Sequence, residues 1–385
     1  MTLIYLAIMA VLCIRITIAV YRRFWDYGLD AEVLFSQHEV EEGGRLYLRE
    51  KVENRKWLPL PTLMVKFGMD RNILCVGASH TSVTDRQYRN DWVAVMPYKR
   101  VTRSIEIIGT KRGYYNIEEV RLVTTDILFR ERLNKTISND TELYVYPSRS
   151  QFMRLPEIFC QMYGESLLNR QLQEDSMEFM GIRDYVQTDS MRKINWKATA
   201  RTGSLKVNQY HDSTSQRLTI LLNVSQTGIL RYYDLIEESI RICRNFIEAF
   251  VQQGIPVRII SNGVDKVTKQ EIFIREGAGL SHIDACLKEL AKMDIYASSR
   301  NMAEVIREQK EAEGEVSLLI SAEQNVELAQ AYLDYVGEKG SANWLIPIHR
   351  ATKEYLTEHV STETLRGNNG NCIHAEYLVM EELGQ

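Results

Sequence analysis

The segment EFMGIRDYVQTDSMRKINWKATARTGSLKVNQY, residues 178–210, gathers charged, aromatic and helix-forming residues into one stretch. A tryptophan is not typical of a solvent-exposed helix, and arginines are not typical of an apolar core. Its charged residues are six cations (Arg183, Arg192, Lys193, Lys197, Arg201, Lys206) and three acids (Glu178, Asp184, Asp189), beside Tyr185 and Trp196.

The order of residues in this segment predicts a loop, a short helix, a turn and a strand. Ser190 stands where a helix N-cap is expected, and good helix formers follow from residue 191 to 201. Gly203 supplies the left-handed residue that ends a helix. Residues 205–210 alternate apolar and polar side chains, as a half-buried strand does.

The segment resembles the signature of a bacterial family known as domain-of-unknown-function family fifty-eight. The family pattern runs glutamate, Leu/Ile-Arg-x-Tyr, Gly-Asp, Arg-x-Ile-x-Trp, Ala-Arg and a lysine-bearing strand. Thr188 replaces the glycine of Gly-Asp, which implies a different turn before the helix. The matching residues are Glu178, Ile182, Arg183, Tyr185, Asp189, Arg192, Ile194, Trp196, Ala200, Arg201, Leu205, Lys206 and Val207.

The resemblance implies a fold and a class of partner. In the family, the signature opens a von Willebrand factor A-like α/β domain that follows a β domain. Such proteins are commonly encoded beside MoxR-type AAA+ ATPases and transglutaminase-like membrane proteins. The resemblance therefore implies an AAA+ ATPase and other membrane proteins as partners.

Length and composition favour a globular protein with two cores. The chain has 385 residues, of which 45% are hydrophobic and 25% charged. Its net charge of -4 gives no overall field that would attract nucleic acid, and we expect none as a partner. The six cysteines are scattered without metal-ligand spacing, which favours free thiols in a reducing compartment.

The amino-terminal residues 3–21 predict one membrane-spanning helix. They are apolar apart from Arg15 and Thr17, and about 19 residues at 1.5 Å each span roughly 28 Å of hydrocarbon. Arg22 and Arg23 follow at once, so the positive-inside rule predicts a single-pass protein of the cell membrane with its bulk in the cytoplasm. Tyr21 and Trp25 are expected in an interfacial aromatic belt.

The remaining chain predicts an α+β multidomain protein. Period-two alternation between turn signals indicates an antiparallel, immunoglobulin-like β-sandwich of roughly seven strands. After residue 216, apolar strands alternate with amphipathic helices, which indicates an α/β domain with a mostly parallel sheet and an edge strand near 372–380. The expected parts are 1–25 (membrane helix and flank), 26–150 (β-sandwich), 151–176 (helical connector) and 177–385 (signature and von Willebrand factor A-like domain).

The end of the first apolar strand is the main candidate for chemistry, because ligands bind past the carboxyl ends of parallel strands. A metal-binding von Willebrand A domain carries Asp-x-Ser-x-Ser there, whereas this chain has Asn223-Val224-Ser225-Gln226-Thr227. The neutral amide cannot neutralise Mg²⁺, so no metal or other cofactor is predicted. Ser225, Thr227 and Glu323 remain the candidate metal ligands, and Ser225 and Thr227 have the alternative role of shaping a loop.

Other patterns do not predict an enzyme. The chain has no G-x-S-x-G, H-E-x-x-H, P-loop or G-x-G-x-x-G motif. Asp184 and Asp189 are candidates for a catalytic dyad, but the nearby cations favour ion pairs. No catalytic residue is predicted. Trp196 and Tyr185 are expected to pack the signature helix against the sheet.

These observations lead to two hypotheses of different classes. In the first, the chain is a membrane-anchored cytoplasmic scaffold that, by resemblance, works with a MoxR-type AAA+ ATPase in assembling or remodelling envelope-associated complexes. In the alternative, it is a metal-dependent ligand-binding or hydrolytic protein that uses Ser225, Thr227 and Glu323 as a degenerate adhesion-type metal site.

Overall fold

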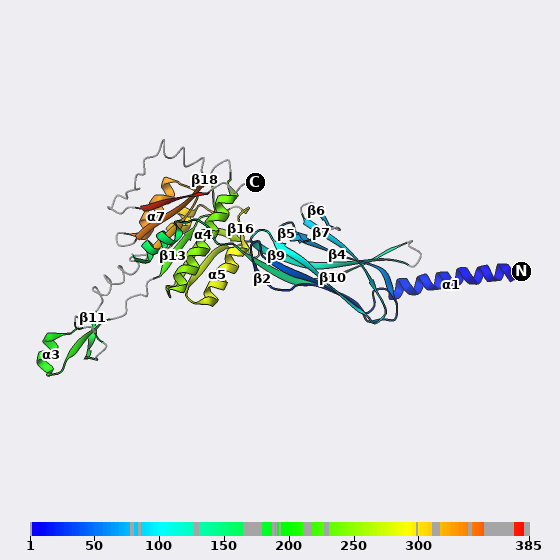
Figure 1. Ribbon diagram of the computed structural model, residues 1–385, viewed down its shortest axis with the longest axis horizontal. Helices are drawn as coiled ribbons and strands as arrows, with labels where there is room; N and C mark the ends of the chain where they lie inside the picture. Colours follow the sequence, from blue (N-terminus) through cyan, green and yellow to red (C-terminus); the bar gives the residue numbers. More distant parts are fainter. Residues whose placement is uncertain are drawn as a thin grey trace. The chain divides into compact units, whose positions relative to one another are not determined.

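The computed structural model describes most of the chain, and Figure 1 shows it as a ribbon. Contacts divide it into two compact units, Met1–Ser148 with Leu290–Lys292, and Arg149–Glu289 with Met293–Gln385. The described residues are 2–77, 81–83, 86–126, 131–164, 179–186, 189, 191, 194–210, 217–226, 231–297, 299–309, 316–337, 341–349 and 373–380.

The first unit begins with helix α1 (Thr2–Phe24). Its segment Ile4–Phe24 is long and apolar enough to cross a membrane, and its side chains are almost all exposed. The expected aromatic belt at Tyr21 and Trp25 is wrong. Both rings are buried in the core of the β-sandwich, because the helix continues beyond residue 21 and packs its last turn against the strands.

Two sheets form the sandwich of the first unit. The four-stranded sheet has the order β1-β3-β8-β5 and is antiparallel throughout. The six-stranded sheet has the order β2-β10-β9-β4-β7-β6, in which only the short β2–β10 pair is parallel. The strands are β1 (Leu29–Phe35), β2 (Glu39–Glu41), β3 (Arg45–Asn54), β4 (Leu60–Asp70), β5 (Ile73–Cys75), β6 (Thr81–Val83), β7 (Arg86–Val95), β8 (Arg100–Gly109), β9 (Gly113–Thr125) and β10 (Arg132–Tyr146).

Alternating side chains fill the space between these sheets. In β3, Leu46, Leu48 and Val52 point inward and are buried, while their neighbours Tyr47 and Arg49 are exposed. The predicted antiparallel β domain is confirmed at this level, and the structure has more strands than the seven expected, because β2, β5 and β6 are three-residue edge strands that alternation cannot reveal.

The second unit contains the signature hairpin, which comprises β11 (Phe179–Asp184), α3 (Trp196–Thr202) and β12 (Lys206–Tyr210). The strand predicted at residues 205–210 is confirmed as β12, and it pairs antiparallel with β11. The expected helix start is wrong: α3 begins at residue 196, and its N-cap is Asn195, whose Oδ1 accepts a hydrogen bond from the Ala198 amide at 2.9 Å. The stop at Gly203 is confirmed, with φ of 73°.

The α/β domain of the second unit is built on a sheet with the order β15-β14-β13-β17-β18-β19, and β16 pairs with β14. All neighbours from β14 to β19 are parallel, whereas β15 and β16 are antiparallel to β14. The predicted parallel sheet and its edge strand are therefore confirmed. The strands are β13 (Leu218–Leu222), β14 (Val257–Asp265), β15 (Glu271–Gly277), β16 (Met293–Asp294), β17 (Val316–Ile320), β18 (Ser341–His349) and β19 (Ile373–Met380).

Four helices accompany this sheet: α4 (Tyr233–Gln252), α5 (Leu280–Lys292), α6 (Met302–Arg307) and α7 (Val326–Val336). Residues 155–164 of the expected connector are helical, residues 151–154 are not, and residues 165–176 lie outside the described residues. Strands β13 and β17 are buried along their whole length, as strands with both faces covered are.

Candidate functional site

Ion pairs organise the charged side chains of the signature hairpin. Arg183 donates to both carboxylate oxygens of Asp189, at 2.7 and 2.6 Å, and Asp189 also accepts from the Val186 amide at 2.9 Å. The Asp189 carboxylate raises the pKa of the Arg183 guanidinium. Lys206 contacts Asp184 at 2.7 Å. The two aspartates are thus partners of separate cations, which supports the ion-pair interpretation over a dyad.

The aromatic residue of the signature helix is not where the sequence predicts it. Trp196 is the first residue of α3 and is 67% exposed, and α3 has no buried residue. The expected packing of this ring against the sheet is therefore wrong. Tyr185 is half-buried and its amide donates to the Leu205 carbonyl at 3.0 Å.

Of the other signature residues, some are exposed and others lie outside the described ranges. Arg201 is exposed in the last turn of α3, where a cation is favourable at the negative end of the helix. The candidates Glu178 and Arg192 lie outside the described residues. Among the described signature residues, the structure therefore brings together Arg183 with Asp189, and Lys206 with Asp184, as two separate pairs.

A second candidate site lies at the carboxyl ends of the parallel strands. Asn223 follows β13, Ser321 follows β17, and Asn262 lies on β14 one residue past the Leu222–Ser261 pair. The parallel register places these three side chains side by side. All three are buried, at 3% exposure or less.

Hydrogen bonds inside this cluster saturate the Asn223 side-chain oxygen. Its Oδ1 accepts three bonds, from the Ser225 amide at 3.0 Å, the Ser225 hydroxyl at 2.8 Å and the Asn262 Nδ2 at 2.9 Å. Its Nδ2 donates to the Ser321 Oγ at 2.9 Å. The side chain that replaces the metal-binding aspartate of the adhesion-type pattern is thus a hub of internal bonds.

The candidate metal ligands take part in the same cluster. The Ser225 hydroxyl donates to Asn223, and the Glu323 amide donates to Ser321 Oγ at 3.1 Å while the Glu323 carbonyl accepts from it at 2.9 Å. Both side chains are half-buried. Thr227 lies outside the described residues. Within the described ranges, no three His, Cys, Asp or Glu residues are grouped as metal ligands.

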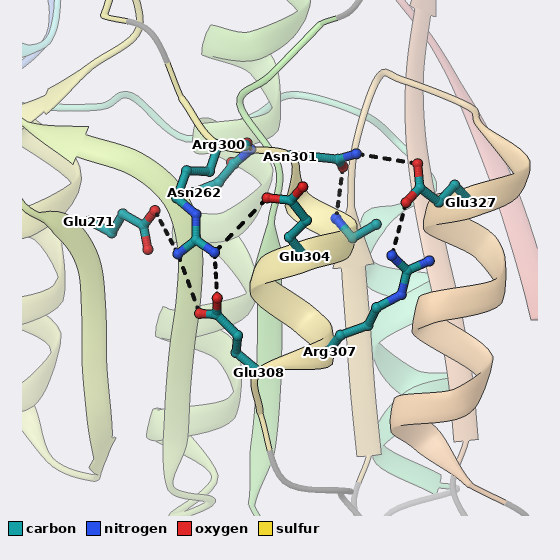
Figure 2. A network of polar contacts seen from close by, with 9 residues as sticks. Asn262, Glu271, Arg300, Asn301, Glu304, Arg307, Glu308 and Glu327 are labelled. Carbon is teal, nitrogen blue, oxygen red and sulfur yellow. Dashed lines mark hydrogen bonds and ion pairs between the residues drawn. The ribbon is translucent and has the colours of Figure 1, made fainter.

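A charged network supports the loop beside this cluster. Figure 2 shows Arg300 facing three glutamates, of which Glu271 lies 3.5 Å away and Glu304 4.0 Å away. Arg300 also contacts Glu308 and holds the pKa of that carboxyl below its usual range. The Arg300 carbonyl accepts from Asn262 Nδ2 at 2.8 Å. The network therefore holds the chain before α6 against the strand ends.

Sequence reasoning found Asn223, Ser225 and Glu323 but missed Asn262. The signal for Asn262 is its place directly after the strand that residues 257–261 predict. Once the sheet is predicted as parallel, the residue after that strand belongs at the same edge as Asn223. Comparison of the ends of neighbouring parallel strands places Asn262 beside Asn223.

Together these features define a protein with an apolar amino-terminal helix, a β-sandwich and an α/β domain whose strand ends carry a closed polar cluster. Residues 181–308 match the model of the family described as "Protein of unknown function DUF58". This match confirms the family resemblance predicted from residues 178–210.

A curated relative is the uncharacterized protein YeaD of Bacillus subtilis (strain 168). It is 23% identical over 259 residues, which are 61% of this chain and 63% of YeaD. The chain thus spans less than two thirds of the length of this relative.

Two solved structures show weak similarity. A non-cellulosomal cohesin from Archaeoglobus fulgidus has a TM-score of 0.21 and 7% identity, over 30% of this chain and 91% of the cohesin. The CARDB domain of the PF1109 protein from Pyrococcus furiosus has a TM-score of 0.19 and 12% identity, over 29% of this chain and 90% of that domain.

Proposed function

We propose that this protein is a membrane-anchored scaffold whose α/β domain, of the von Willebrand factor A-like kind, serves as a binding platform in the cytoplasm. The observation that carries this proposal is the saturation of Asn223 Oδ1. This oxygen accepts three internal hydrogen bonds, which supports a rigid, buried polar cluster beneath the strand ends over a set of metal ligands.

The membrane anchor in this proposal is helix α1. Ile4–Phe24 has the length and apolar character of a span, and Arg22 and Arg23 follow its apolar part. The positive-inside rule favours the cytoplasm for the two units that follow. A reporter fused after residue 26 that is active outside the cell would contradict this orientation.

The partner in this proposal comes from the family resemblance. We expect a MoxR-type AAA+ ATPase to bind the α/β domain, with other membrane proteins as members of the same complex. Assembly or remodelling of envelope-associated complexes is the process that such a pair would serve.

Co-purification from native membranes tests this partner. The tagged full-length chain is expected to retain an AAA+ ATPase, identified by mass spectrometry, in at least one nucleotide state. Glu323→Lys reverses a charge at the strand-end cluster and is expected to weaken the retention. Asp334→Lys is the matched control, because Asp334 is exposed about two turns past the start of α7 and its carboxylate accepts a hydrogen bond from the Gln330 side chain. Absence of any AAA+ ATPase, or equal loss in both variants, contradicts the proposal.

The metal-dependent alternative rests on the half-buried Ser225 and Glu323, which lie where α/β domains bind ligands. Calorimetry of the full-length chain in detergent with Mg²⁺ and Mn²⁺ discriminates the two hypotheses. Saturable binding that Ser225→Ala abolishes would favour the metal-dependent protein. Heat of dilution alone favours the scaffold.

A further inference from the structure

Helix α1 leaves the β-sandwich at one end (Figure 1). Three connections of the sandwich at this end carry exposed aromatic side chains. Tyr27 belongs to the α1–β1 connection, Trp57 to the β3–β4 loop and Tyr98 to the β7–β8 loop. Their exposed fractions are 72%, 58% and 70%. We call these three residues, with Phe24 and Met96, the aromatic rim; the last two are also exposed.

Hydrogen bonds join the three loops into one surface. The Arg55 amide donates to the Gly28 carbonyl at 2.8 Å, and the Tyr98 amide donates to the Lys56 carbonyl at 3.3 Å. Buried Asn54 donates through Nδ2 to carbonyls of both loops, Leu58 at 2.9 Å and Met96 at 3.2 Å. The rim is therefore held in place by the sandwich and does not depend on free loops.

The backbone at Tyr98 supports a function for this exposure. Its φ is 55°, in the left-handed region that a bulky residue rarely adopts. A disfavoured backbone that holds a tyrosine ring in solvent is of the kind found at binding surfaces.

Cations surround the aromatic rim. Arg22 and Arg23 lie in the last turn of α1, Arg55 follows β3, Lys99 precedes β8 and Arg100 begins it; all five are exposed. Four acids lie in the same region: Asp26, Asp30, whose charge acts on Arg55, Glu53, which bonds Arg55 and Arg100, and Glu131, which pairs with Arg22. The net charge of the side chains around the rim is thus positive, although the net charge of the whole chain is negative.

We propose that the aromatic rim docks on the surface of an anionic phospholipid bilayer, which fixes the sandwich against the membrane that α1 crosses. The occupant follows from continuity, because the rim surrounds the point where a span-length apolar helix enters the sandwich. Tryptophan and tyrosine rings favour the headgroup level of a bilayer, and arginine and lysine favour anionic lipids. This inference rests on the proposed membrane anchor.

The rim also replaces the belt that the sequence predicts at the wrong residues. Tyr21 and Trp25 are buried in the sandwich core, so they cannot face lipid headgroups. Trp57 and Tyr98 supply exposed rings at the same level of the molecule, from loops that are far away in sequence. Hydropathy of the helix and its flanks alone cannot reveal them.

Site-specific labels in reconstituted full-length protein test this docking. A fluorophore is attached at Trp57→Cys or Tyr98→Cys, after Cys13→Ala, Cys160→Ser and Cys372→Ser have removed other reactive thiols. Arg71→Cys is the control, because it follows the far end of β4, about 34 Å from Leu60 at ~3.4 Å per residue. Vesicles contain phosphatidylcholine with or without phosphatidylglycerol, and a lipid with a nitroxide at headgroup level.

We expect the nitroxide to quench the labels at 57 and 98 and to leave the label at 71 unquenched. Phosphatidylglycerol is expected to increase the quenching at both rim positions. If the protein floats with the vesicles but rim and control labels are quenched equally, the rim proposal is wrong and the anchor stands. If the protein does not float, the anchor is wrong and the rim proposal fails with it.

Discussion

Single buried polar side chains determine the hydrogen bonding and the charge of the interior of each unit. Asn223 is the clearest case, because replacing a carboxylate by an amide changes both charge and donor capacity. The amide Nδ2 gives Ser321 a hydrogen bond that a carboxylate cannot give. The neutral residue therefore completes the cluster without an ion.

Asn223→Asp is expected to destabilise the α/β domain by about 1–3 kcal/mol, because it removes a buried donor and adds a buried charge. Thermal unfolding with and without Mg²⁺ measures this loss and any rescue by the ion. Asn325→Asp is the control: Asn325 caps α7 by accepting bonds from the Glu327 and Leu328 amides, which an aspartate also does. Equal stability of both variants would contradict the hub role, and full rescue by Mg²⁺ would favour the metal-dependent alternative.

Glu50 shows the opposite situation, a buried acid beside a second acid. On β3 it is 1% exposed, neither carboxylate oxygen accepts a hydrogen bond from the described residues, and its protonated form can donate to Asp91. Burial, and then the charge of Asp91, raise its pKa from 4.5 to about 7, against the lowering effect of Arg103 and Arg89.

The stability of the sandwich should therefore fall as the pH rises from about 4.5 to about 7 and level off above. In that window the folded state keeps a proton that the unfolded state has lost, so unfolding becomes easier with increasing pH. Glu50→Gln should remove this slope and stabilise the sandwich at pH 8 by roughly 1–3 kcal/mol. Hydrogen exchange of the β3 and β7 amides across this range measures both effects. Glu106→Gln, on the exposed ion pair with Arg45, should keep the slope.

At the scale of elements, helix α3 of the signature hairpin depends on its two caps rather than on buried residues of its own. Helix α3 is seven residues long and has no buried residue, so local bonds at Asn195 and Gly203 define its ends. This explains why the sequence predicted the end of the helix but not its start. Gly203 is the one glycine between residues 190 and 210, whereas both Ser190 and Asn195 are good N-caps.

Gly203→Ala is expected to weaken α3 by about 1–2 kcal/mol, because a side chain is strained at φ of 73° even where no atom lies within 4 Å. Gly181→Ala in β11 is the control, since nothing lies within 4 Å there either and its φ is not positive. Hydrogen exchange of the Gly203 amide, which bonds the Thr199 carbonyl, reports the change. Similar protection in the two variants would show that the cap does not hold the helix end.

At the scale of the whole molecule, patterns along the chain predicted the layers and missed the contacts between distant segments. Alternating apolar and polar residues predicted the antiparallel sheets, and continuous apolar runs predicted the parallel sheet, because each kind of strand has its own residue pattern. The strand-end partner Asn262 and the aromatic rim come from loops or strands that meet only after folding. The burial of Tyr21 and Trp25 also follows only from the folded structure, because an aromatic residue beside a membrane helix can pack equally well against lipid headgroups or in a protein core.

This burial predicts that the boundary of a soluble fragment determines its stability. A fragment of residues 26–385 lacks the rings of Tyr21 and Trp25 and the Trp25 carbonyl that accepts from buried Lys56. Truncating a single buried Phe or Trp costs about 3–5 kcal/mol, so this fragment should unfold well below a fragment of residues 20–385 in thermal scans. Trp57→Ala in the longer fragment is the control, because Trp57 is exposed on the rim and its loss should leave the midpoint nearly unchanged. Equal midpoints for the two fragments would mean that the last turn of α1 does not belong to the sandwich, and the exposed rim would then have to act without a fixed helix at its centre.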